Sequence, residues 1–158
     1  MPIILIKLYI QQISRMLDPM FERCLYFNVN ALARSVNRMW NDAYSEFNLS
    51  PSHAYLLRLV SSQPGLTPKQ ICLELKLEKS TISRFLDALV LKGLIRRKKG
   101  VSGDAREQGI FLTKKSAKIS FQLEQKGDEL YQKLILSLGK PELTSLVNEL
   151  RKTKAQID

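Results

Sequence analysis

The sequence predicts a mainly α-helical fold that contains one small β-hairpin. Apolar residues recur at steps of three and four along most of the 158-residue chain, which is the spacing of amphipathic helices. Between residues 94 and 113 this spacing gives way to two short apolar runs on either side of a polar loop. Proline and glycine separate the periodic segments without forming a linker. We therefore expect several helices around one hairpin, in one domain or two closely joined ones.

The first helix is expected over roughly Pro19–Phe47, because an apolar stripe runs along this segment from Leu25 onward. Ser50 and Pro51 then begin a second helix, with serine as the N-cap and proline at the first helical position. The apolar residues of this second helix continue until the break at Pro64. Both helices therefore have clear ends in the sequence.

Two shorter helices follow. Thr67 and Gln70 have the spacing of a capping box, which predicts a short helix that runs to Leu75. A polar turn leads to a fourth helix over roughly Lys79–Lys92, which Gly93 closes. Two short helices joined by a turn of three or four residues describe a helix-turn-helix.

The remaining chain predicts the hairpin and two more helices. We expect short strands at Leu94–Arg97 and Ile110–Thr113, then a fifth helix over about Lys114–Ser137 and a sixth helix after Gly139. The apolar stripes of the first, fifth and sixth helices exceed what a small core can cover, so a two-fold dimer through these helices is the simplest arrangement. The expected division is an N-terminal arm with the first dimerisation helix (1–49), a winged helix-turn-helix (50–113) and C-terminal dimerisation helices (114–158).

The charge of the chain favours a polyanionic partner. Lys and Arg number 25 against 15 Asp and Glu, for a formal net charge of +10. Such an excess favours nucleic acid first and an acidic membrane second, and charge alone does not choose between them. Cys24 and Cys72 lie in different predicted helices, which indicates a reducing, cytoplasmic setting. The apolar run at residues 3–6 is too short to span a membrane, so we expect no membrane partner.

The fourth helix begins with polar side chains that suit the major groove of DNA. Short hydroxyl groups permit close approach to the bases, and arginine can bond guanine bidentately. The candidate DNA contacts of this recognition helix are Lys79, Ser80, Thr81, Ser83 and Arg84. The alternative interpretation is a capped, solvent-exposed first turn, and the helix taken alone does not decide between the two.

The hairpin favours the DNA-binding interpretation. Basic residues flank its tip, where they can follow phosphates or enter a minor groove. Asp104 lies two residues before Arg106, and we expect this acid to hold the guanidinium in a fixed pose. The candidate DNA contacts of the wing are Arg96, Arg97, Lys98, Lys99, Asp104 and Arg106.

Together, the fourth helix and the hairpin resemble the MarR family of winged helix-turn-helix transcriptional regulators. The resemblance depends on Asp104-Ala105-Arg106 followed by Ile110–Thr113, and on the segment from Lys79 to Ile95; it extends over about Phe21–Arg151. It implies a homodimer held by the first, fifth and sixth helices, with recognition helices in successive major grooves and Arg106 in the flanking minor groove. The sequence departs from the family at Ser116, where glycine is common, so the start of the fifth helix is expected to differ.

From these observations we expect a sequence-specific regulator that binds double-stranded DNA. We expect a repressor that acts as a homodimer on a pseudo-palindromic operator and is released by a small molecule or an oxidant. The alternative is a winged-helix module for protein interaction or for nonspecific architectural DNA binding. No glycine-rich phosphate loop or nucleophile elbow predicts an enzyme. One histidine and two separated cysteines predict no metal site, and no cofactor is expected.

Two further sites are hypotheses. The resemblance implies a crevice for a small aromatic effector between the dimer helices and the DNA-binding lobe, for which the candidates are Trp40, Tyr44, His53 and Tyr55. Aromatic residues at helical spacing more commonly belong to the core. Cys24 is a candidate redox residue, because one peroxide-sensing branch of the family has a reactive cysteine just before the position of Phe27. Tyr26 occupies that place here, so an inert, partly buried thiol is the favoured interpretation of Cys24.

Overall fold

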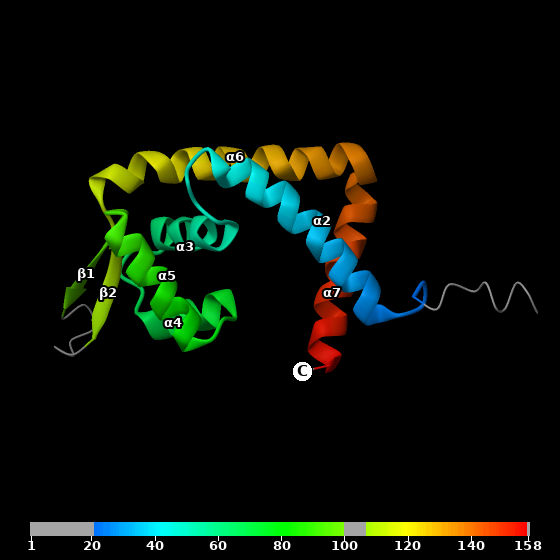
Figure 1. The fold of residues 1–158 in the computed structure, drawn as a ribbon, viewed down its shortest axis with the longest axis horizontal. Coiled ribbons are helices and arrows are strands. Elements are labelled where there is room, and N and C mark those ends of the chain that lie inside the picture. Colours follow the sequence, from blue (N-terminus) through cyan, green and yellow to red (C-terminus); the bar gives the residue numbers. More distant parts are fainter. Residues whose placement is uncertain (1–20, 100–106, 158) are drawn as a thin grey trace, which may run out of the picture. The chain divides into compact units, whose positions relative to one another are not determined.

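The structure is a computed structural model that describes residues 21–99 and 107–157 (Figure 1). The chain forms two compact units, one that ends at Met39 and one that begins at Trp40. The elements of the described residues are, in order, α2 (Leu25–Ser45), α3 (Pro51–Ser62), α4 (Pro68–Leu75), α5 (Lys79–Leu91), β1 (Ile95–Lys99), β2 (Gln108–Leu112), α6 (Lys114–Leu138) and α7 (Lys140–Ile157). This order confirms the expected fold class, a mainly helical chain with one antiparallel hairpin. Asp104, Arg106 and the apolar N-terminal arm lie outside the described residues.

Helix α2 begins later and ends earlier than the sequence predicts. Residues 21–23 form a turn, and the side-chain amide of Asn28 donates to the carbonyls of Phe21, Glu22 and Cys24, each at 2.9 Å. These bonds hold the turn against the first helical turn, so α2 begins at Leu25 and not near residue 19. At the other end, Asn48 adopts a φ of 53°, and the chain turns into α3.

The start signals of α3 and α4 are confirmed. The Ser50 hydroxyl accepts a hydrogen bond from the His53 amide, and Thr67 and Gln70 form a reciprocal capping box. The buried faces of α3, α4 and α5 then meet in one apolar core, whose fully buried members include Leu56, Leu57, Ile71, Ile82 and Leu89. The buried face of α5 ends at Leu89, because Val90 is 42% exposed.

The hairpin is displaced along both strands relative to the prediction. Strand β1 pairs antiparallel with β2 from Ile95 opposite Leu112 to Lys99 opposite Gln108. The loop before α4 adds hydrogen bonds on the other edge of β2, because the Gly65 amide donates to the Ile110 carbonyl at 2.8 Å and the Ile110 amide donates to the Leu66 carbonyl at 2.9 Å. The ladder partners determine these strand ends, and the apolar run alone does not.

Ser116 shapes the junction between the hairpin and α6. Ser116 is fully buried, forms a capping box with Thr113, and donates from its hydroxyl to the Leu94 carbonyl. The Thr113 hydroxyl in turn donates to the Gly93 carbonyl at 2.8 Å. The base of the hairpin and the first turn of α6 are therefore joined by side-chain hydrogen bonds, and a glycine at position 116 would lose those of Ser116.

Helices α6 and α7 leave much of their apolar surface exposed in the single chain. Along α7 only Leu143 is buried, whereas Leu146, Val147 and Leu150 are between 40% and 45% exposed. Helix α6 exposes Phe121 and Leu136. Contiguous apolar faces of this kind are typical of an interface between protein chains.

Candidate nucleic-acid interface

Helix α5 presents one polar face and buries the other. Of the five candidate DNA contacts on this helix, Lys79, Ser80, Ser83 and Arg84 are exposed and Thr81 is half-buried. On the opposite face Ile82 is completely buried. Because residues at i, i+3, i+4 and i+7 share one side of a helix, Ser80, Ser83 and Arg84 form a stripe that continues to Asp87.

Asp87 joins the recognition helix to the wing. Its carboxylate accepts a hydrogen bond from Nη2 of Arg97 in β1, in an ion pair whose side chains are 64% and 37% exposed. An ion pair this exposed contributes at most about 1 kcal/mol to stability. Its larger effect is on charge, because Arg97 neutralises an acid in the middle of the exposed stripe. Helical spacing places Asp87 on the stripe, but it does not predict the partner in β1.

The wing strands carry the other predicted basic residues. Arg96, Lys98 and Lys99 are exposed, and the Arg96 guanidinium carbon lies 5.8 Å from the centre of the Phe111 ring on the paired strand. This cation–π contact holds the stem of Arg96 beside the sheet. The predicted brace between Asp104 and Arg106 lies outside the described residues.

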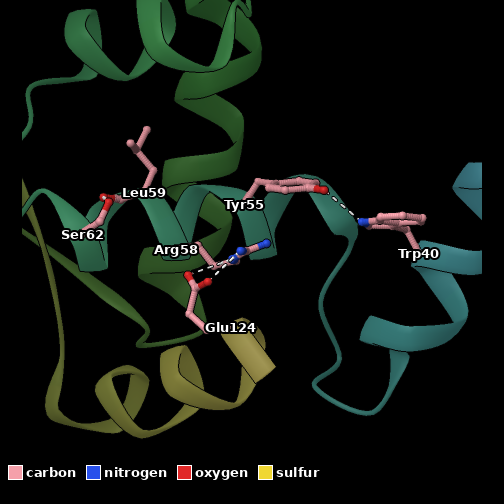
Figure 2. Close-up of polar contacts among 6 residues, drawn as sticks. All are labelled: Trp40, Tyr55, Arg58, Leu59, Ser62 and Glu124. Carbon is pink, nitrogen blue, oxygen red and sulfur yellow. Dashed lines mark hydrogen bonds and ion pairs between the residues drawn. The ribbon is translucent and has the colours of Figure 1, made fainter. Parts of the chain in front are cut away.

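A second ion pair joins α3 to α6. Arg58 donates from Nε and Nη2 to the two carboxylate oxygens of Glu124, at 2.8 and 2.7 Å (Figure 2). The two side chains are 25% and 48% exposed. These hydrogen bonds lower the pKa of Glu124, and the same contact raises the pKa of Arg58. The partners are 66 residues apart in sequence, so no local pattern could have predicted their contact.

The four candidate crevice residues occupy three different surroundings. Trp40 donates from its indole nitrogen to the Tyr55 hydroxyl at 2.9 Å (Figure 2). Tyr44 is completely buried near the positive charge of Arg58, but its hydroxyl has no partner in hydrogen-bond geometry. Burial raises the pKa of Tyr44, and the charge of Arg58 partly offsets that effect. His53 lines a hollow whose lining does not include the other three residues.

His53 lines a shallow pocket of about 570 Å³ formed mainly by the end of α2, the loop to α3 and Lys92. Its Nδ1 lies 2.9 Å from the Ser50 hydroxyl oxygen, and its ring meets the edge of Phe85 with 5.1 Å between ring centres. Its Nε2 is buried and has no hydrogen-bond partner. Burial and the nearby charge of Lys92 both lower the pKa of His53.

Cys24 and Cys72 are both free and half-buried. Cys24 precedes the first residue of α2, and its carbonyl oxygen accepts the Asn28 side-chain hydrogen bond. Within the described ranges, no group of three or more His, Cys, Asp or Glu side chains is arranged to hold a metal ion. None of the described helices has the length and apolar character needed to cross a membrane.

Comparison with known proteins finds a family match over part of the chain. Residues 47–107, which contain α3, α4, α5 and β1, match the MarR family model. This match confirms the resemblance for the segment that contains the recognition helix and the first strand of the wing. A comparison with curated protein sequences finds no match.

Solved structures of MarR-family and other regulators share the fold. MepR of S. aureus, in complex with DNA, is 22% identical, covers 87% of this chain and 100% of its own, and has a TM-score of 0.78. A mutant MarR of E. coli, complexed with operator DNA, is 24% identical over 86% of this chain and 99% of its own, with a TM-score of 0.75. The regulator PcaV of Streptomyces coelicolor, in complex with its natural ligand, is 20% identical over 87% of this chain and 96% of its own, with a TM-score of 0.77. These likenesses confirm the winged fold.

Proposed function

We propose that this protein binds double-stranded DNA sequence-specifically, with α5 in the major groove and the hairpin along the flanking backbone. The observation that carries the proposal is the two-sided character of α5. One face is buried, and the other exposes Ser80, Ser83 and Arg84 with Lys79 at its start. Hydroxyl groups and one arginine on a protruding helix match the donors that read base edges. An apolar protein-binding helix would instead expose aliphatic or aromatic anchors.

The wing adds sequence-independent affinity in this proposal. Arg96, Lys98 and Lys99 project from β1 and can neutralise phosphates, while Arg97 is engaged by Asp87. We place Arg106 in the flanking minor groove, braced by Asp104, as the family resemblance implies. The DNA complexes of MepR and of the mutant MarR support DNA binding by a chain of the same fold.

We further propose a homodimer formed by α2, α6 and α7. In the single chain these helices expose apolar side chains that water would otherwise surround, including Leu32 on α2, Phe121 on α6 and Leu150 on α7. A two-fold axis would place two recognition helices about one helical turn of DNA apart, which suits a pseudo-palindromic operator. On this proposal, residues 50–113 read DNA while residues 1–49 and 114–158 hold the dimer.

A dimer on an operator would act as a repressor by blocking access to a promoter. We propose that a small molecule releases it, and the complex of PcaV with its natural ligand supports ligand control in a protein of this fold. The site nearest to this role contains Trp40, Tyr44 and Tyr55. Trp40 donates to the Tyr55 hydroxyl, the Arg58 guanidinium lies over the Tyr55 ring, and the charge of Arg58 acts on Tyr44. Release by oxidation of Cys24 is the less supported route.

The decisive experiment is selection of bound fragments from sheared host DNA at physiological salt, followed by sequencing. Wild-type protein is expected to enrich a short inverted repeat. Arg84→Ala should lose about 1–3 kcal/mol of discrimination at one base position in each half-site, because a bidentate contact to guanine is worth that much. Lys118→Ala, which removes an equal charge from the exposed surface of α6, is the matched control and should leave the enriched sequence unchanged.

The outcomes separate the competing functions. Enrichment of one motif supports a sequence-specific regulator. Binding without any preferred sequence would favour an architectural role, and no binding at all would favour a protein-interaction module. Equal effects of Arg84→Ala and Lys118→Ala would show that only net charge matters, which contradicts base reading by α5.

A further inference from the structure

The contact between α3 and α6 has a fixed geometry that the sequence does not suggest. Arg58 uses two donors to hold both oxygens of Glu124, so the guanidinium and the carboxylate must lie in one plane (Figure 2). The Arg58 guanidinium also lies over the Tyr55 ring, 5.6 Å from its centre. Arg58 is therefore held on two sides, by an acid of α6 and by an aromatic ring of its own helix.

Gly127 leaves room for the Arg58 guanidinium against α6. A Cβ atom at this position would lie 2.9 Å from Nη1 of Arg58 and 3.1 Å from Cζ, which is closer than van der Waals contact allows. Glycine is unfavourable in the middle of a helix, and Gly127 lies near the centre of α6. A methyl group here would have to displace the Arg58 guanidinium, which its two hydrogen bonds to Glu124 restrain.

The Arg58 contact is one of several that hold α6 to the rest of the fold. The capping network of Thr113 and Ser116 lies at the start of α6, and Lys126 pairs with Glu46 at 2.9 Å. Glu124 lies about 15 Å beyond the first residue of the helix. Because the Arg58 contact is bidentate and lies more than two turns beyond the caps, it restrains the direction of α6 relative to α3.

Helix α3 connects this contact to the DNA-reading elements. It packs against α4, α5 and β2 as well as against α6. A change in the angle between α3 and α6 therefore moves the recognition helix and the hairpin together relative to α6.

We propose that Arg58, Glu124 and Gly127 form a positioning seat that sets the direction of the DNA-reading lobe (α3, α4, α5, β1 and β2) on α6. In the dimer the same seat, present twice, would set the separation of the two recognition helices. This consequence rests on the proposed function, because it requires α6 to be a dimer helix and α5 to read DNA. Since both partners of the ion pair are partly exposed, the seat contributes to geometry more than to stability.

The first test measures the direction of the lobe without DNA. Nitroxide labels are attached to Ser83→Cys on α5 and Gln132→Cys on α6, both exposed positions, in a full-length chain with Cys24→Ser and Cys72→Ser. Pulsed electron paramagnetic resonance should give a narrow distance distribution in this background. Adding Glu124→Gln or Gly127→Ala should broaden or shift the distribution. Glu149→Gln, which breaks the exposed ion pair with Lys152 on α7, is the matched control and should leave it unchanged.

The second test measures the consequence for operator binding. We expect Glu124→Gln and Gly127→Ala to weaken binding to a duplex with two half-sites by about tenfold or more, because the second half-site no longer meets its lobe. Affinity for a duplex with a single half-site should change by less than about threefold. Thermal unfolding should stay within about 3 °C of wild type, which separates a positioning effect from a loss of folding.

The outcomes of the two tests distinguish failure of the seat from failure of the proposed function. Unchanged distance distributions in both variants would overturn the seat, whatever the protein binds. Altered distributions with equal losses on the single and double half-sites would also contradict it, because the lobe itself would then be damaged. If wild-type protein shows no preference for the double site over a shuffled duplex, the proposed function fails, and the distance measurement still decides the seat.

Discussion

At the scale of single residues, buried polar groups have the clearest consequences. His53 is held by the Ser50 hydroxyl on one ring nitrogen, while the other nitrogen is buried without a partner. A protonated ring would carry a second buried N–H and a charge beside the cation of Lys92. The neutral ring is therefore the stable form in the folded chain.

This arrangement predicts a loss of stability in mild acid. Burial lowers the pKa of His53 below its ordinary value near 6.5, so the unfolded chain binds a proton more readily than the folded chain. The free energy of unfolding should be constant above about pH 6.5 and fall below it, by at most about 1.4 kcal/mol per pH unit. Urea unfolding at pH 7.5, 6.5 and 5.5 and at one protein concentration measures this change.

His53→Gln is the control for the acid effect. His53 is the only histidine of the chain, so the variant removes the only imidazole that titrates in this range. The variant should lose less stability between pH 7.5 and 5.5 than wild type does. Identical pH dependence in both proteins would show that His53 is not buried as a neutral ring.

Single residues also show how much of the structure local sequence determines. The caps at Ser50 and Thr67 were predictable, because each depends on groups within three residues of one another. Ser116 was recognised only as a departure from a family pattern. Its bond to the Leu94 carbonyl closes the base of the hairpin across 22 residues, which no local rule describes.

At the scale of elements, the exposed apolar face of α7 leads to a testable prediction about the dimer. Leu146, Val147 and Leu150 lie on one face of this helix and remain exposed in the single chain. If that face is buried by a second copy, a charge placed in it must be desolvated or must break the contact.

We predict that Leu150→Glu raises the dissociation constant of the dimer roughly hundredfold, because each protomer loses the burial of a leucine side chain. Sedimentation equilibrium across a range of protein concentrations measures the constant. Asn148→Glu adds the same charge at an exposed position of the same helix and should leave it unchanged. Equal dimer dissociation constants in all three proteins would show that α7 is not part of the interface.

The elements also show which element ends sequence patterns do not predict. Apolar periodicity and the positions of glycine predict every helix of the described residues. The predicted strand ends differ from the observed ones by up to two residues. The extent of β1 depends on which residues of β2 face it, and that pairing is a property of two segments. The start of α2 depends on Asn28 bonding backward to the preceding turn.

At the scale of the whole molecule, sequence patterns could not predict the contacts that join distant segments. The exposed face of α5 could be predicted from spacing, and the structure confirms four of its five residues as exposed. The ion pairs between Asp87 and Arg97 and between Arg58 and Glu124 could not, because each needs the fold to bring its partners together. These same contacts hold the recognition helix to the wing and the lobe to α6.

The central claim is that a dimer of this chain reads a specific DNA sequence through α5 and the wing. It is tested most directly by titrating the selected operator and a shuffled duplex of the same composition with the protein, at physiological salt. The account predicts two chains per operator and an affinity at least about a thousandfold higher than for the shuffled duplex. Equal affinities for the two duplexes would contradict it.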